Sequence, residues 1–172
     1  LEFAKSQNWT ETDADILTGY NVQNFDTPYL MNRAKTLGIE EEFELMGRVK
    51  DKRAVMKIAS FSSSAFGTRH STETIMEGRI MMDVIQYMYR NQKLSSYSLN
   101  AVSAEFLGQQ KEDVHHSMIS VLHCGNEQDR RRLAVYCMKD AVLPQMLIDK
   151  LMIIVNYVEM ARVTGVPIPY LL

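Results

Sequence analysis

Apolar residues fall in short runs in the first half of the chain and at helical spacing in the second half. Residues 16–20 are apolar or β-branched, which predicts a short buried strand. Pro28 fits a first helical turn because its missing N–H costs nothing there, so we expect a helix over residues 29–37. Asp26 or Thr27 is the expected cap of that helix. The pattern is therefore a strand, a helix and, between Tyr20 and Tyr29, a polar connection that we call the elbow.

Alternating polar and apolar residues dominate the next stretch. They predict a long, exposed β-hairpin over about residues 55–80, and Arg69 gives the region near its tip a local positive charge. Residues 78–84, with Ile80, Met81 and Met82 at their centre, predict a buried strand that leads into a helix over residues 84–91. Strands that alternate with helices in this way predict an α/β fold.

The second half of the chain is predicted to be helical. Ser98 and Gly108 bound one expected helix, a second occupies residues 114–124, and a third begins at Glu127. Pro144 is expected to kink or restart this third helix, which then continues to about residue 164.

The composition fits one domain. The 172 residues are 46% hydrophobic, so we expect residues 1–172 to form a single domain with a core of its own, in which the twelve methionines are interpreted mainly as filler. The net charge of −2 gives no overall basic field, so any contact with nucleic acid must be local. Cys124 and Cys137 have no Cys-x-x-Cys partner, which is typical of free thiols in a reducing compartment. No run suits a membrane span, so no membrane partner is expected.

The elbow after the first predicted strand carries the best candidate chemistry. Asn21, Phe25 and Asp26 follow one another as Asn-x-x-x-Phe-Asp at the carboxyl end of a strand, where α/β proteins usually build sites. A structural alternative remains open at this point. In that interpretation Asp26 only caps a helix, Phe25 is a core residue and Asn21 closes a turn.

A second candidate lies on the helix that begins at Glu127. Tyr136 and Asp140 are four residues apart, so on a helix they share a face and can point at one reacting group. The alternative is a half-buried tyrosine beside a surface aspartate. Three consecutive arginines, residues 130–132, suit either a solvated or a phosphate-facing surface.

Other polar residues are given structural interpretations. Asp13 and Asp15 are expected in a solvated loop, and Asp83 is interpreted as a helix cap rather than a catalytic acid. The histidines at positions 115, 116 and 123 lack the further ligands that zinc requires.

Three long segments carry a resemblance to a known family. They are GYNVQNFDTPYL, SYSLNAVSAEFLGQQKEDVHHS, and RRRLAVYCMKDAVLP followed by NYVEMARVTGVPIPYLL. In this order and spacing they closely resemble the exonuclease domain of the family B DNA polymerases, and Asn-x-x-x-Phe-Asp followed by Pro-Tyr-Leu resembles its second exonuclease motif. The resemblance implies a ribonuclease H-like α/β fold, incomplete at its N-terminus, with the β-hairpin as an insertion. It also implies a proofreading 3′-to-5′ exonuclease that removes mispaired nucleotides from a primer end.

The resemblance also implies roles for single residues. Asp26 and Asp140 match metal ligands, and the family holds two Mg²⁺ ions. Tyr136 matches the tyrosine that positions the attacking water, while Asn21 and Phe25 match residues that hold the terminal nucleotide. The hairpin resembles one that helps to separate primer from template, where the charge of Arg69 suits DNA.

The family's first motif, an Asp-x-Glu on a strand, is expected to lie upstream of Leu1, so the fragment itself is expected to be inactive. The resemblance implies four partners: primer-template DNA, a single-stranded 3′ end, the rest of the polymerase chain and its accessory subunits. It also implies a location in the nucleus. The alternative function is a non-catalytic module of the same fold that binds single-stranded DNA or a subunit.

Overall fold

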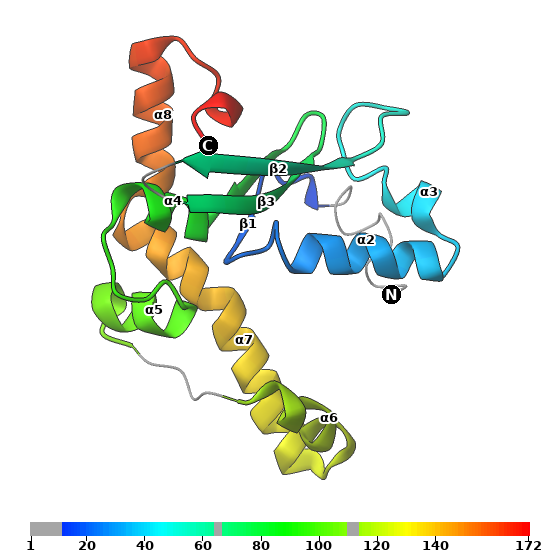
Figure 1. Cartoon of the computed structure of the whole chain (residues 1–172). Coiled ribbons are helices and arrows are strands. Elements are labelled where there is room, and N and C mark those ends of the chain that lie inside the picture. Colours follow the sequence, from blue (N-terminus) through cyan, green and yellow to red (C-terminus); the bar gives the residue numbers. More distant parts are fainter. Residues whose placement is uncertain (1–11, 64–66, 110–113) are drawn as a thin grey trace. The chain divides into compact units, whose positions relative to one another are not determined.

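The computed structural model describes residues 12–63, 67–109 and 114–172 (Figure 1). The chain divides into two compact units. The first unit comprises Leu1–Asp83 and Pro167–Leu172, and the second comprises Val84–Val166. Each unit packs as a compact body of its own.

The first unit is built on two short parallel strands. Strand β1 (Ile16–Gly19) pairs with β4 (Ile80–Asp83), so that Gly19 and Asp83 lie opposite each other at the carboxyl end. Helix α2 (Asp26–Thr36) follows β1 after the elbow, and the short α3 (Glu40–Phe43) and the 3-10 turn η2 (Ile168–Tyr170) complete the unit. The strand, elbow and helix predicted from the sequence are confirmed, as is the mixed α/β character.

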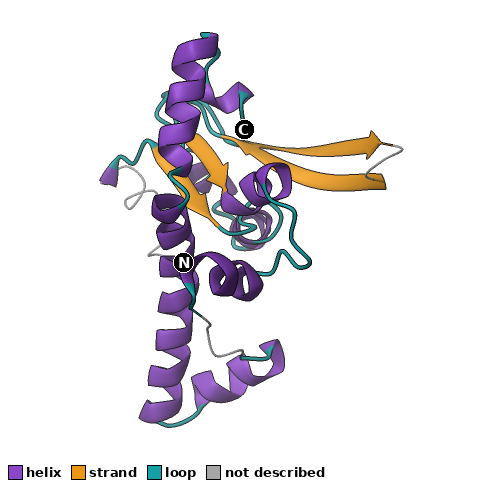
Figure 2. Cartoon of the chain, turned by 90° about the vertical axis from the view of Figure 1, so that its left-hand side faces the viewer, coloured by secondary structure: helices purple, strands orange, loops and turns teal. Residues whose placement is uncertain are grey.

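The predicted hairpin is also present. Strands β2 (Val55–Ser63) and β3 (Gly67–Ile75) form a two-stranded antiparallel ribbon, which Figure 2 shows as two long strands side by side. Arg69 lies opposite Phe61 in this register. The side chains of residues 59–71, including that of Arg69, lie outside the described part of the structure.

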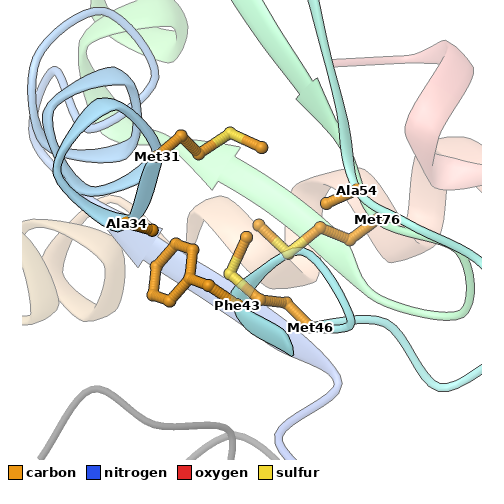
Figure 3. Packing of buried hydrophobic residues seen from close by; sticks show 6 residues of the cluster. All are labelled: Met31, Ala34, Phe43, Met46, Ala54 and Met76. Atoms are coloured by element: carbon orange, nitrogen blue, oxygen red, sulfur yellow. The ribbon is translucent and has the colours of Figure 1, made fainter. Parts of the chain in front are cut away.

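A small core rich in methionine holds the first unit together (Figure 3). Its buried members come from α2, α3, the loops beside them and the end of the hairpin. They are Met31, Ala34, Phe43, Met46, Ala54 and Met76. Methionine is unbranched and adaptable, so it fills the irregular space between a helix, a ribbon and short loops. The interpretation of methionines as core residues is correct here but wrong for Met118 and Met152, which are 46% and 57% exposed.

Two arginines fix the segment that leads into β1. Arg79 is buried directly before β4, where its Nε donates to the Met46 carbonyl over 2.9 Å and its guanidinium lies 3.2 Å from Asp13. Arg48 pairs with the same carboxylate at 2.7 Å and also with Asp15. The segment expected to be a simple solvated loop is therefore anchored, because a buried guanidinium requires acceptors on all sides.

The second unit is helical, as predicted. Helices α4 (Val84–Asn91), α5 (Leu99–Leu107), α6 (His116–Cys124) and α8 (Ile153–Thr164) all contact the long α7 (Glu127–Lys150). The Ser98 hydroxyl caps α5 by accepting the N–H of Ala101 at 3.2 Å. Asn126 and Asp129 form a reciprocal capping box at the start of α7, which fixes where that helix begins.

The break in the long helix is not where the sequence placed it. Helix α7 runs through Pro144 without ending, and the chain breaks instead at Met152, which has a left-handed φ of 50°. Pro144 is buried beside Leu143 and Leu147, so burial of its ring offsets the hydrogen bond that proline cannot donate. Among the described residues no single helix could cross a membrane, and only α7 and α8 together, bent by 47°, reach the necessary length and apolarity.

Candidate functional site

The elbow between β1 and α2 is held in shape by a buried acid. Asp83, the last residue of β4, accepts the backbone N–H of Asn21 at Oδ1 over 2.7 Å and that of Gln23 at Oδ2 over 3.1 Å. Its side chain is buried, and Asn21 has a left-handed φ of 62°, a conformation that asparagine tolerates better than most residues. Bonds to both carboxylate oxygens fix this turn, a role for Asp83 that the sequence did not indicate.

The elbow also explains how α2 begins. The helix starts at Asp26, and neither Asp26 nor Thr27 caps it with a side chain, contrary to expectation. The N–H of Thr27 instead donates to the Val22 carbonyl over 2.9 Å, and the N–H of Phe25 donates to the Asn21 carbonyl over 3.1 Å. Backbone carbonyls of the turn satisfy these early amides, so the Asp26 carboxylate is not needed as a cap.

Two aromatic rings stand exposed where the elbow meets the helix. Phe25 is 69% exposed and Tyr29, one helical turn further on, is 63% exposed. The interpretation of Phe25 as a core residue is therefore wrong. Large exposed apolar side chains that share one face mark a surface that can contact a ligand.

Asp26, the first residue of α2, adds a carboxylate directly after Phe25 in the sequence. Partial burial raises the pKa of its carboxyl group above the ordinary value, while a hydrogen bond from its own backbone N–H acts in the opposite direction. A carboxylate that has lost part of its water shell gains strongly from a nearby cation. Its chemistry therefore suits a metal ligand.

The raised pKa of Asp26 can be measured in the folded chain. In a carboxyl ¹³C NMR titration, Asp26 is expected to titrate above the ordinary aspartate range and Asp13 below it, because Arg48 donates to the Asp13 carboxylate. Asp13 thus serves as an internal control of opposite sign. Ionisation of Asp26 opposes folding, so this residue's contribution to stability falls as the pH rises through its pKa, and Asp26→Asn is expected to remove that slope. An Asp26 midpoint at or below that of Asp13 would contradict this assignment.

The second candidate pair lies on α7. Tyr136 and Asp140 belong to one uninterrupted helix, as predicted, and both are half-buried, whereas the residues between them are exposed. They continue the stripe that Leu143 and Leu147 bury further along the helix. Asp140 is therefore not the surface residue of the structural alternative. A phenol and a carboxylate face the same side of α7.

Carboxylate oxygens at Asp26 and Asp140 are of the kind that Mg²⁺ prefers. Within the described ranges, no group of three or more His, Cys, Asp or Glu side chains lies close enough together to hold a metal ion. Asp26 belongs to the first unit and Asp140 to the second. Each residue alone offers the right donor but an incomplete ligand set.

Comparison with known proteins identifies the family. Residues 5–102 match the model of the family described as DNA polymerase family B, exonuclease domain. The chain therefore belongs to the exonuclease domain family of the family B DNA polymerases.

Relatives extend this similarity over nearly the whole chain. It is 62% identical over 162 residues to the DNA polymerase delta catalytic subunit of Arabidopsis thaliana and 57% identical over 162 residues to that of Schizosaccharomyces pombe, with 94% of the chain covered in each case. It is 56% identical over 160 residues to the same subunit of Bos taurus, with 93% covered. The chain spans only about 15% of the length of these curated relatives.

Proposed function

We propose that this chain is part of the proofreading 3′-to-5′ exonuclease domain of a replicative DNA polymerase, which removes mispaired nucleotides from a primer end. One observation carries the proposal. In a chain of this family, Phe25 stands exposed at the start of α2, directly before Asp26 and within the sequence Asn-x-x-x-Phe-Asp. An aromatic surface next to a carboxylate can hold a base while the bond beyond it is cut.

The elbow residues would bind the terminal nucleotide. Phe25 would stack on its base, since every base has a π face and stacking therefore tolerates any sequence. Asn21 would hydrogen-bond to the same nucleotide from the turn that Asp83 fixes. A fixed turn favours reaction because the scissile phosphate is then held in one orientation beside Asp26.

Asp26 and Asp140 would supply two of the carboxylates for the Mg²⁺ ions. When bound, such ions activate water and stabilise charge on the leaving oxygen during phosphodiester hydrolysis. Tyr136, on the same face of α7 as Asp140, would accept or donate a hydrogen bond to the attacking water and hold it in line. The remaining ligands would come from an Asp-x-Glu pair, a sequence that does not occur within the 172 residues.

The proposal for the fold, hairpin and partners of the complete domain rests on the family to which the chain belongs. The complete domain would have a ribonuclease H-like fold, and the hairpin with Arg69 would touch DNA where primer and template separate. Its partners would be primer-template DNA, the rest of the polymerase chain and accessory subunits. The protein would act in the nucleus. The second candidate is a non-catalytic module, because an exposed pair such as Phe25 and Tyr29 can hold single-stranded DNA without cutting it.

The role of Phe25 can be tested by binding. Phe25→Ala is expected to weaken binding of a short single-stranded oligothymidylate by about tenfold, since stacking of one base on an aromatic ring contributes on the order of 1–3 kcal/mol. Thermal stability is expected to change little because the ring is 69% exposed. Tyr170→Ala removes a ring that is 84% exposed elsewhere in the first unit and is the matched control. Equal weakening in both variants would argue against a site at the elbow.

A further inference from the structure

We propose that Asn24 is a positioning residue that decides which end of the Asn21 amide faces a bound nucleotide. The inference rests on the proposed function and deepens it. Asn24 lies between the hairpin and the elbow: the N–H of Thr72 donates to Asn24 Oδ1 over 2.9 Å, and Asn24 Nδ2 donates to Asn21 Oδ1 over 3.1 Å. The two bonds form a short relay from β3 to Asn21.

The backbone of β3 sets the polarity of this relay. A backbone N–H can only donate, so the atom that faces Thr72 must be the oxygen of the Asn24 amide. The NH₂ group of Asn24 then faces Asn21 and requires an acceptor there. Asn21 must therefore turn its own oxygen toward Asn24, which leaves its NH₂ group to donate to a ligand.

The donor on β3, the backbone N–H of Thr72, has a fixed direction. Thr72 lies opposite Ile58, and its N–H is directed to Asn24 rather than across the ribbon, as in a non-hydrogen-bonded pair of an antiparallel ladder. A backbone group within a strand cannot rotate to present an acceptor. The other end of the relay is equally fixed, because Asp83 holds the backbone N–H of Asn21 at 2.7 Å.

This polarity defines the ligand atom that Asn21 recognises. An NH₂ group requires an acceptor, and the phosphate and sugar oxygens of a nucleotide are acceptors that do not depend on the base. Had the amide been reversed, Asn21 would present an oxygen to these oxygens and repel them. The relay thus makes Asn21 a sequence-independent donor, which suits a site that must accept any mispaired end.

The first arm of the test needs no ligand. In the ¹⁵N-labelled chain, the side-chain amide of Asn21 is expected to be ordered. It is expected to lose order in Asn24→Leu, which keeps the shape but not the hydrogen bonds, and in Thr72→Pro, which removes the N–H that donates to Asn24. Proline is tolerated where a strand N–H faces outward. Ile58→Pro, on the opposite strand of the same pair, is the matched control and is expected to leave Asn21 unchanged. An Asn21 amide equally ordered in all four proteins would overturn the proposal.

The second arm measures binding of oligothymidylate (dT)₄ by fluorescence anisotropy. Asn24→Leu and Thr72→Pro are each expected to weaken binding by about threefold to tenfold, the loss of one directed hydrogen bond. The double variant is expected to be no weaker than either single one, because both changes interrupt the same relay. Fully additive losses, or none, would overturn the proposal. Wild-type binding that Asn21→Ala leaves unchanged would instead refute the proposed nucleotide site, whatever the first arm shows.

Discussion

On a primer that ends in a mispair, the 172-residue chain with Mg²⁺ is expected to release nucleotides at least about a thousandfold more slowly than a version extended upstream through an Asp-x-Glu strand. The physical reason is the number of carboxylates. Asp26 and Asp140 would carry half the negative charge that two Mg²⁺ ions require, so both ions could not be held at working concentrations. Loss of either ion would remove several kcal/mol of transition-state stabilisation, and each 1.36 kcal/mol is about a factor of ten in rate.

Both proteins would be compared at equal concentration on the same labelled primer, and a fully paired primer would control for non-specific nucleases. Comparable degradation by the two, abolished in each by Asp140→Ala, would refute the requirement for the missing motif. Degradation that survives Asp140→Ala in both proteins would come from a contaminating nuclease, so the Asp140→Ala variants separate that activity from the activity of the chain.

The second large effect is expected from the carboxylates themselves. In the extended chain, Asp26→Asn and Asp140→Asn are each expected to lower the rate of nucleotide release by at least about a thousandfold, since an amide cannot replace a charged Mg²⁺ ligand. Asp149→Asn, an exposed position on the same helix as Asp140, is the matched control and is expected to retain full activity. Circular dichroism would confirm that all variants fold.

A double variant sharpens this result. If Asp26 and Asp140 serve one set of ions, changing both is expected to cost little more than changing either, because residues that act as a unit are not additive. Independent, multiplicative losses would show that the two residues act in separate places.

The sequence predicted β1, α2, the hairpin and β4 of the first unit because each has a local cause. Residues 16–20 and 78–84 are stretches of strand length that contain consecutive apolar residues, and β1 and β4 lie within them. Their parallel pairing places Gly19 opposite Asp83, a contact across 64 residues that no local pattern encodes. The buried role of Asp83 was missed for that reason, although its position at the end of a predicted strand was a usable signal.

Long-range packing also explains why the predicted helix break and the predicted cap of α2 were wrong. Pro144 is a helix breaker by propensity, but the apolar surroundings of α7 keep the helix intact, and the chain breaks at Met152 instead. The capping of α2 was misplaced because Asn21 and Val22 supply backbone carbonyls from a turn that depends on Asp83. Local propensity decides such points only where tertiary contacts do not.

The candidate site was predicted in part. Asn-x-x-x-Phe-Asp indicated the elbow, and the exposure of Phe25 removes the alternative in which it is a core residue. The spacing of Tyr136 and Asp140 correctly placed both on one face of a helix. Asn24 was not singled out, because its value lies in a hydrogen bond to Thr72, 48 positions away in the sequence.

The most direct test of the account is whether Asp26 and Asp140, which lie in different units, bind the same ions. The measurement is paramagnetic broadening of NMR signals in the extended, labelled chain as Mn²⁺ is added in place of Mg²⁺. The account predicts that signals of Asp26 and Asp140 broaden together at the same low Mn²⁺ concentration, and that Asp26→Asn weakens the broadening at Asp140. Broadening of one residue without the other, or an Asp140 response that Asp26→Asn does not change, would contradict it.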